Sequence, residues 1–172
     1  MNITKEIPDK VQDTGAELTQ LLTLFDQEQI NTLPFEGSWT AAQVAEHVTR
    51  SNKGIARALD MEGKTADRDP EARVQELKEI FLNFNVKFQS PEFILPTQDY
   101  YQKEELLQDF KKTIAHLQET GNKVNLYDEI NLPPFGEITK LELLHFVLYH
   151  TQRHIHQVKN ILLLRQKSKD LV

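Results

Sequence analysis

The segment from Leu143 to Leu163 carries apolar residues and two histidines at the spacing of one helix face. Steps of three and four residues return to the same side of an α-helix, so residues related in this way form one stripe. The stripe consists of Leu143, Val147, His150, His154, Val158 and Ile161. Because an apolar stripe of this length must be covered by other elements, the segment predicts a helix within a packed domain, with both histidines stacked on its buried face.

Three further segments repeat this pattern, and together the four predict an all-α fold. The expected long helices cover residues 7–29, 40–58, 103–119 and 139–166, and a shorter helix is expected over 71–83. Two of the long helices begin with a complete capping box, formed by Thr40 with Gln43 and by Thr139 with Glu142. No segment alternates as a strand over more than a few residues. The chain of 172 residues is therefore predicted to form one domain, residues 1–172, which is a four-helix bundle with long connections.

The connections between the predicted helices contain residues that break helices. The stretch from Met61 to Pro70 is charged and is predicted to be an exposed loop. The stretch from Asn85 to Asp99 contains Pro91 and Pro96, which favour an irregular connection packed near the end of the bundle. Because two of the connections are long, the four helices need not follow a simple up-and-down order.

The composition narrows the chemistry that the chain can perform. There is no cysteine, which excludes disulfides, thiolate zinc sites and cysteine nucleophiles, so a metal would be held by histidine, carboxylate or water. The net charge of -6 argues against a nucleic-acid-binding surface or an affinity for anionic membranes. No apolar run approaches the roughly 18 residues of a membrane span, and the polar segment Met1–Lys10 does not have the pattern of a signal peptide. We therefore expect a cytoplasmic protein.

A third histidine, His47, lies on the inner stripe of the predicted helix 40–58. Imidazole is the commonest metal ligand in proteins, and two histidines four residues apart on a helix can reach one ion. His47, His150 and His154 could together hold one divalent ion, for which zinc and nickel are the expected metals. Three protein ligands leave coordination positions open for water or substrate, a pattern that is typical of catalytic sites.

The alternative to a metal site is a buried polar cluster without an ion. In that arrangement His150 would hydrogen-bond Ser51 or a backbone carbonyl, and His47 would meet Gln43 one turn back. Three neutral imidazoles in one apolar seam would leave several ring nitrogens without partners, and burying such groups is costly. This cost favours the metal site.

The remaining histidines are expected to lie outside the site. His145 and His156 share a second helix face, at a helix contact or a dimer surface, and His116 is predicted to be solvated. Candidates for a general base or a substrate-binding group are Glu46, Asn52, Arg153 and Gln157. Each of these four is more typical of a surface or packing residue, so the sequence assigns no catalytic residue.

Two motifs resemble a known protein family. Residues 37–48, Gly-Ser-Trp-Thr-Ala-Ala-Gln-Val-Ala-Glu-His-Val, resemble the Trp-Ser/Thr…His entry to the second helix of the DinB/YfiT-like four-helix-bundle superfamily. Residues 134–158, which contain the pair His150-Thr-Gln-Arg-His154, resemble the last helix of that family. The resemblance implies a metal-binding bundle, usually dimeric, whose divalent ion is held by His47, His150 and His154.

The resemblance leaves the reaction open, because a fold does not determine a function. Some members of the family are similar to transferases that add a low-molecular-weight thiol such as bacillithiol to an electrophile, and others are described as metal-dependent hydrolases. We therefore expect a metal-dependent enzyme in which the ion activates a thiol or water for attack on a small-molecule substrate. A thiol S-transferase is the first hypothesis. A hydrolase and a non-catalytic metal-binding module of stress response or interaction are the alternatives.

A homodimer is expected as well. The resemblance implies a dimer, and the last helix carries more apolar residues than fit on one inward-facing stripe, which leaves apolar side chains for a contact with a second copy. The apolar residues in question are Ile155, Ile161, Leu162, Leu163 and Leu164.

Overall fold

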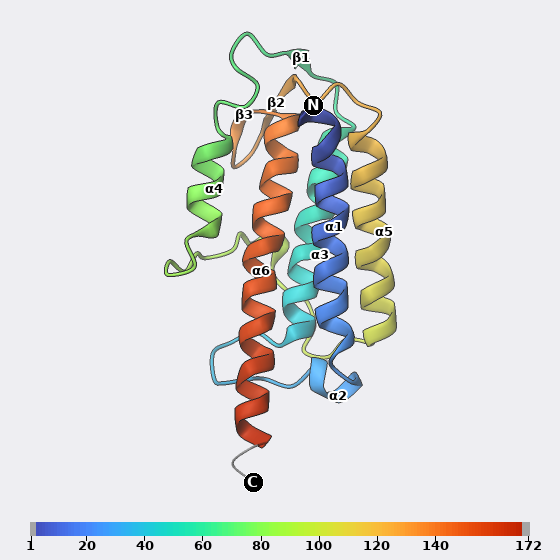
Figure 1. Cartoon of the computed structure of the whole chain (residues 1–172), viewed down its shortest axis with the longest axis vertical. Helices are drawn as coiled ribbons and strands as arrows, with labels where there is room; N and C mark the ends of the chain where they lie inside the picture. Colours follow the sequence, from blue (N-terminus) through green and yellow to red (C-terminus); the bar gives the residue numbers. More distant parts are fainter. Residues whose placement is uncertain (1–2, 170–172) are drawn as a thin grey trace.

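A computed structural model of the chain describes the backbone of residues 3–169 as a helical bundle with a small sheet at one end (Figure 1). Its elements are α1 (Ile3–Thr23), α2 (Gln27–Ile30), α3 (Ala41–Leu59), β1 (Lys64–Thr65), α4 (Val74–Leu82), the 3-10 helix η1 (Glu92–Ile94), α5 (Lys103–Gly121), β2 (Asp128–Leu132), β3 (Gly136–Thr139) and α6 (Lys140–Lys169). Residues 1–2 and 170–172, at the ends of the predicted domain, lie outside the described residues. The predicted four-helix bundle is confirmed.

The bundle consists of α1, α3, α5 and α6, which lie side by side, while α4 packs on the outside of α6 (Figure 1). Followed along the chain, α1 and α6 run in one direction and α3 and α5 run in the other. The order is not a simple up-and-down one, because the chain between α3 and α5 returns along the length of the bundle. Fully buried side chains from all four helices fill the centre, among them Leu18, Leu22, Val44, Phe110, Leu117 and Val147.

Both predicted capping boxes are present at the starts of α3 and α6. The Gln43 backbone N–H donates to Thr40 Oγ1 at 3.1 Å, and the Thr40 N–H donates to Gln43 Oε1 at 3.0 Å. The Glu142 N–H donates to Thr139 Oγ1 at 3.1 Å, and the Thr139 N–H donates to Glu142 Oε2 at 2.9 Å. These reciprocal bonds satisfy N–H groups that have no carbonyl partner inside the helix, so they define where α3, with His47, and α6, with His150 and His154, begin.

The helix predicted over residues 7–29 is in fact two helices. The helix α1 ends at Thr23, and a third capping box at Asp26 starts the short helix α2. The Gln29 N–H donates to Asp26 Oδ1 at 2.8 Å, and the Asp26 N–H donates to Gln29 Oε1 at 2.9 Å. An aspartate that accepts from the backbone in this way favours a helix start over a helix interior, which is why the longer prediction was wrong.

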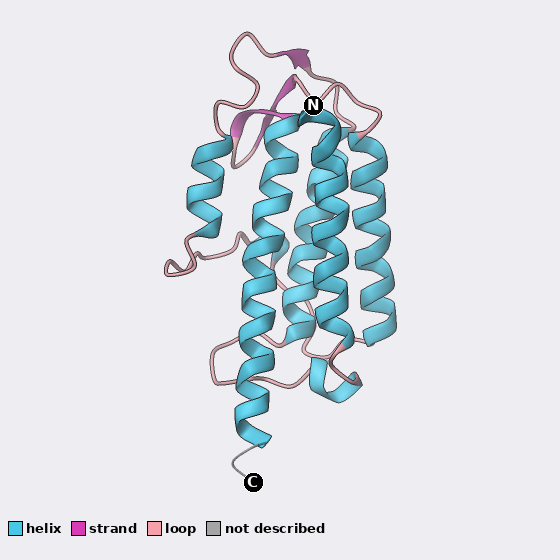
Figure 2. Cartoon of the chain, viewed as in Figure 1, coloured by secondary structure: helices cyan, strands magenta, loops and turns pink. Residues whose placement is uncertain are grey.

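The structure also contains three short strands that the sequence pattern did not indicate. The strands β1, β2 and β3 form an antiparallel sheet in that order at one end of the bundle (Figure 2). Residues Ile130 and Ile138 face each other between β2 and β3, and Thr139 ends the sheet directly before α6 begins. Strands of two to five residues are too short to show a period-two pattern, so the sequence does not reveal them.

The stretch from Met61 to Pro70 is tied to the bundle and is not simply an exposed loop. It contributes β1, and the Arg68 guanidinium donates two hydrogen bonds of 2.8 Å to the carboxylate of Glu142 and one of 2.7 Å to Glu129. Glu142 is fully buried. Burial alone would raise the pKa of Glu142, but the hydrogen bond from Arg68 and those from the backbone N–H groups of Thr139 and Arg73 lower it overall.

The connection after α4 is irregular, as predicted, and it contains the 3-10 helix η1. This short helix contacts α3, where the Arg50 guanidinium donates to the Phe93 carbonyl oxygen at 2.8 Å. The segment therefore lies against the helix that carries His47. Among the described helices, none has the length and apolar character that crossing a membrane requires.

Candidate metal centre

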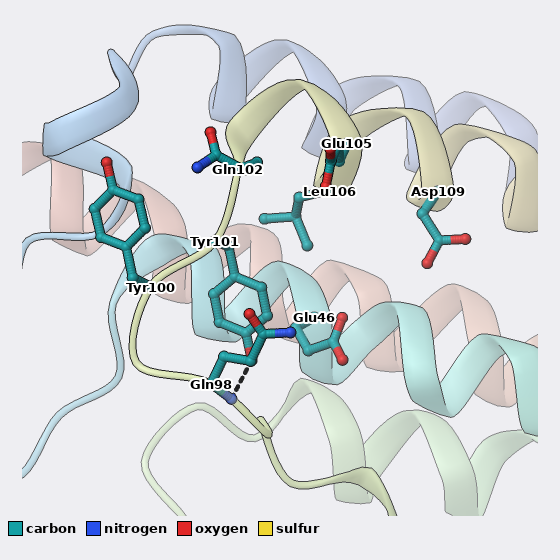
Figure 3. Close-up of a pocket in the computed structure, with 8 residues that line it drawn as sticks. All are labelled: Glu46, Gln98, Tyr100, Tyr101, Gln102, Glu105, Leu106 and Asp109. Atoms are coloured by element: carbon teal, nitrogen blue, oxygen red, sulfur yellow. Dashed lines mark hydrogen bonds between the residues drawn. The ribbon is translucent and has the colours of Figure 1, made fainter.

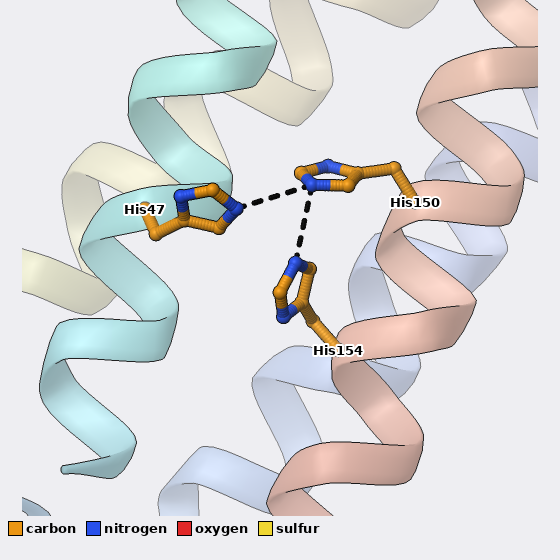
Figure 4. A group of neighbouring side chains, drawn as sticks. All are labelled: His47, His150 and His154. Atoms are coloured by element: carbon orange, nitrogen blue, oxygen red, sulfur yellow. Dashed lines mark hydrogen bonds between the residues drawn. The ribbon is translucent and has the colours of Figure 1, made fainter. Parts of the chain in front are cut away.

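The structure brings His47 from α3 together with His150 and His154 from α6 (Figure 4). The Nε2 atom of His150 lies 3.1 Å from the Nε2 atom of His47 and 3.1 Å from that of His154. The three candidate ligand atoms lie within 4.8 Å of one another, and all three residues are buried. The inward stripes of two helices that face each other thus meet at one point.

The outer nitrogens of two of the rings are held by hydrogen bonds. The Nδ1 atom of His47 lies 2.9 Å from the backbone carbonyl oxygen of Ile94, which can only accept, so this Nδ1 carries the proton. The Nδ1 atom of His154 lies 2.8 Å from Oε1 of Gln157. A ring that donates from Nδ1 has a lone pair on Nε2, so both rings turn an acceptor towards the centre of the cluster.

The three rings suit an ion better than they suit one another. A neutral His150 has at most one Nε2–H, which can serve only one of its two neighbours, so without an ion at least one of the 3.1 Å contacts joins two lone pairs. Nitrogens that lie about 2.0–2.1 Å from one ion, at angles of about 90–109°, are separated by about 2.9–3.4 Å. Two of the three Nε2 separations, each 3.1 Å, fall within this range. The third, between His47 and His154, lies within 4.8 Å, so a small approach of these two rings would complete the set around a divalent ion.

The buried polar cluster considered as the alternative lacks the hydrogen bonds expected of it. Gln43 is engaged with Thr40 and with the carbonyl oxygen of Gln98, and does not meet His47. The buried Nδ1 atom of His150 has no hydrogen-bond partner among the described residues, so neither Ser51 nor a backbone carbonyl serves it.

Burial keeps the three imidazoles neutral. It lowers the pKa of His154 to about 3 and the pKa of His150 well below its ordinary value. The pKa of His47 is lowered by burial as well, although the Ile94 carbonyl oxygen acts in the opposite direction. The neutral ring is the form that binds metals, so the environment prepares all three side chains as ligands.

The histidines lie in the wall of a groove with a volume of about 1310 Å³. Aromatic side chains form much of the remaining wall, and we call this set the aromatic wall: Trp39, Phe81, Phe84, Phe88, Phe135 and Phe146. The ring of Phe146 stacks on His150 with centroids 5.1 Å apart, and Trp39 lies 5.0 Å from His47. No local pattern in the sequence indicates this wall, because Phe146 on α6 is joined there by residues from α4 and from connections whose place against the bundle depends on the whole fold.

The four weaker candidates separate in the structure. Gln157 directly contacts His154, one of the three proposed metal ligands. Arg153 instead donates to the backbone carbonyl oxygens of Phe81, Asn83 and Val86. Asn52 is fully buried, and neither its side-chain oxygen nor its nitrogen has a hydrogen-bond partner among the described residues.

Glu46 lines a second cavity of about 370 Å³, between α3 and the start of α5 (Figure 3). The acidic side chains of Glu105 and Asp109 border the same cavity, and the three histidines do not. Glu46 is therefore placed away from the proposed metal centre.

The other three histidines stay outside the cluster. His116 is exposed, with Nε2 3.8 Å from an Asp60 carboxylate oxygen. His145 is buried beside Tyr149, and burial together with the charge of Lys10 lowers the pKa of His145 to about 4. His156 is exposed at the groove, where its ring stacks on Phe84 at a centroid distance of 4.1 Å.

Comparison with solved structures gives two similar chains. The crystal structure of TT2238, a four-helix bundle protein, is 22% identical with a TM-score of 0.59, and the match covers 91% of this chain and 98% of that one. The protein YfiT from Bacillus subtilis, described as a probable metal-dependent hydrolase with an unusual four-helix bundle topology, is 14% identical with a TM-score of 0.64. That match covers 92% of this chain and 85% of YfiT. At these identities the likeness shows the fold alone.

Comparison by sequence is more specific about the family. The search of curated proteins found no match. A family model described as the DinB superfamily matches residues 11–158, a range that includes α3, α6 up to Val158 and all three clustered histidines. The chain belongs to the DinB superfamily.

Proposed function

We propose that the protein is a metal-dependent enzyme in which His47, His150 and His154 hold one divalent ion, zinc or nickel. The observation that carries the proposal is the convergence of three buried Nε2 atoms in the wall of a large groove. Its support from relatives is the family itself and the description of YfiT as a probable metal-dependent hydrolase. Three histidine ligands leave coordination positions free, as a catalytic site requires.

The nucleophile we propose is a low-molecular-weight thiol such as bacillithiol, with water as the alternative. A bound divalent ion lowers the pKa of a thiol or of water, and so supplies the anion at neutral pH. Among the described residues that line the groove, none is an aspartate or a glutamate, so no carboxylate is placed to act as general base. A thiol, with a pKa of about 8.5, is far more acidic than water and needs less help to lose its proton.

The size of the groove also favours two substrates. A site for one small molecule usually has a volume of about 300–1,000 Å³. The groove, at about 1310 Å³, leaves space for a thiol beside an electrophile. In the proposed transfer, the thiol proton passes to solvent and the sulfur electron pair forms a bond to an electrophilic carbon. The leaving group departs with the electron pair of the bond that breaks.

Side chains and backbone groups around the three histidines would orient the proposed ligands and shield the reacting groups. The Ile94 carbonyl oxygen and the Gln157 side chain hold the rings of His47 and His154 in fixed orientations. The rings of Trp39 and Phe146 lie against His47 and His150 and cover part of the cluster, so a reactant bound there would be partly shielded from water.

The test is elemental analysis of the purified protein, followed by a transfer assay. Bacillithiol and 1-chloro-2,4-dinitrobenzene would be mixed with protein that has been loaded with zinc or nickel, or stripped with a chelator. We expect thiol consumption and chloride release in equal amounts only when metal is present. Hydrolysis of a carboxylic ester without thiol would favour the hydrolase, and stoichiometric metal without turnover in either assay would favour a non-catalytic module.

We also propose that the protein is a homodimer. The last turns of α6 extend beyond the other helices of the bundle, and Leu163 is 54% exposed there (Figure 1). By contrast, Ile155 and Ile161 are buried within the chain, so only part of the apolar surplus noted in the sequence is available to a partner. Light scattering decides the point, because a monomeric mass at micromolar concentration contradicts a stable dimer.

A further inference from the structure

The charges that line the large groove are all of one sign. Its described lining residues include Lys87, Arg153 and Lys167, which we call the groove cations, and no aspartate or glutamate. The chain as a whole has 26 acidic residues and a net charge of -6, so this surface is an exception to its overall charge. A cleft lined by charge of one sign concentrates the local potential and attracts ligands of opposite charge.

The groove cations differ in their surroundings: Arg153 is bonded to backbone oxygens, whereas the two lysines are exposed. Arg153 lies on α6 between His150 and His154, and its bonds to the carbonyl oxygens of Phe81, Asn83 and Val86 hold it beside the proposed metal centre.

Lys87 and Lys167 are exposed, and neither forms an ion pair with another described side chain. A neutral ligand that covered these ammonium groups would remove water from them without replacing it, whereas an anion would compensate their charge.

The groove also presents apolar surface that only a ligand of some size would cover. Phe84 is 43% exposed and Phe88 is 49% exposed, although both belong to the aromatic wall. Phe93, which also lines the groove, is 64% exposed. Exposed aromatic rings clustered around a concave site are typical of surfaces that bind apolar partners.

We propose that the groove binds an organic anion with a bulky apolar body, which contains an aromatic ring or an equivalent hydrocarbon. The anionic group lies near Lys87 and Arg153, and the body lies against the aromatic wall. Lys167, about 21 Å farther along α6 than Arg153, adds to the positive potential of the groove. The inference rests on the proposed function, in which this molecule is the electrophile that receives the thiol. It narrows the substrate class to acids, and it disfavours cationic and small polar substrates.

The test uses two dyes that share one aromatic body. 8-Anilinonaphthalene-1-sulfonate carries a sulfonate, and N-phenyl-1-naphthylamine is the same ring system without it. Trp39 is the single tryptophan of the chain and belongs to the aromatic wall, so quenching of its fluorescence reports a dye in the groove. With the full chain, both metal-free and zinc-loaded, we expect the sulfonate to bind at least about tenfold more tightly, and this preference to shrink at high salt.

Charge reversal shows whether the groove cations cause the preference. The double variant Lys87→Glu/Lys167→Glu should bind the sulfonate about tenfold more weakly and leave the affinity for the neutral dye unchanged. The matched control is Lys111→Glu/Lys112→Glu, which reverses two charges at exposed lysines of α5 that do not line the groove. Circular dichroism verifies that all three proteins are equally folded.

Three results would overturn the inference. They are equal affinity for the two dyes, an unchanged sulfonate affinity in the Lys87→Glu/Lys167→Glu variant, and binding that emerges only when the protein is diluted, which would mean that a second copy covers the groove. The dye assay needs neither thiol nor turnover. Anion binding without thiol transfer would therefore support this inference and contradict the proposed function. Thiol transfer without any preference for anions would support the proposed function and contradict this inference.

Discussion

Gln157 and His154 lie one turn apart on α6, and the side-chain oxygen of Gln157 is 2.8 Å from Nδ1 of His154. This contact fixes the proton of His154 on Nδ1 and directs the Nε2 lone pair towards the other two histidines. Gln157 would therefore influence the affinity of the proposed metal centre without being a ligand itself.

The first prediction follows from this contact. Gln157→Leu removes the acceptor and should weaken zinc affinity by about 10–100-fold, as loss of such hydrogen bonds does at other histidine sites. Gln157→Glu is the matched control, because it retains an oxygen at the same reach and should stay close to the original protein. Competition titration with a chromogenic chelator measures the affinity, and equal values for the leucine variant and the original protein would remove Gln157 from the site.

The second prediction concerns the ligands themselves. His154→Ala should reduce metal occupancy more strongly than Gln157→Leu, because it deletes one of the three nitrogens that we propose as ligands. His116→Ala is the control, since His116 is exposed on α5 and lies outside the cluster. Elemental analysis after dialysis gives the occupancy. Full occupancy in a His47, His150, His154 triple alanine variant would refute the assignment of the three ligands.

The third prediction concerns acid stability and His145. Burial lowers the pKa of folded His145 to about 4, against about 6.5 in the unfolded chain. Between these values the unfolded chain binds more protons, so the free energy of unfolding falls as pH decreases from about 6.5 and levels off below about 4. The slope due to one histidine is at most about 1.4 kcal/mol per pH unit.

The measurement is urea unfolding at several pH values in the presence of a chelator, so that bound metal does not contribute. His145→Leu cannot take up this proton and should show a shallower decline than the original protein over the same pH range. The buried ligand histidines contribute to the decline in both proteins, and the difference between the two curves isolates His145. Identical slopes would show that His145 does not titrate in this way.

The fourth prediction concerns the ion pair between Arg68 and Glu142. Glu142→Gln keeps the shape of a fully buried side chain but removes its charge, which leaves Arg68 with a weaker partner. The Arg68 side chain is 32% exposed and retains Glu129, so we expect a loss of about 2–3 kcal/mol, below the usual cost of breaking a buried pair. Glu137→Gln, an exposed position on β3, should change the free energy of unfolding by less than about 0.5 kcal/mol.

Chemical denaturation at neutral pH compares these two variants with the original protein. If Glu142→Gln unfolds at the same denaturant concentration as the original, the pair contributes nothing to stability. The 61–70 segment would then be held by β1, by the contact of Arg68 with Glu129, and by the hydrogen bonds from Thr139 to the Pro70 carbonyl oxygen and from Lys140 to the Met61 carbonyl oxygen.

Features that depend on neighbours in the chain could be predicted from the sequence. The capping boxes at Thr40 and Thr139 join residues three apart, and His150 and His154 share a helix face because they are four apart. The apolar stripes of the four long helices, repeated over several turns, predicted the bundle. The box at Asp26 is equally local, and the prediction missed it because the apolar pattern continued through it.

Only the tertiary structure decided which distant residues meet. His47 and His150 are 103 positions apart, Arg68 and Glu142 are 74 apart, and the aromatic wall gathers residues from α4, α6 and several connections. Such contacts depend on how the helices are ordered and where the connections pack, and these follow from the sum of many weak interactions over the whole chain. The sequence by itself therefore determined the helices, their buried faces and the chemical type of the three histidines. The folded chain determined that their nitrogens converge, and that they do so in the wall of a groove that carries cations and no carboxylate.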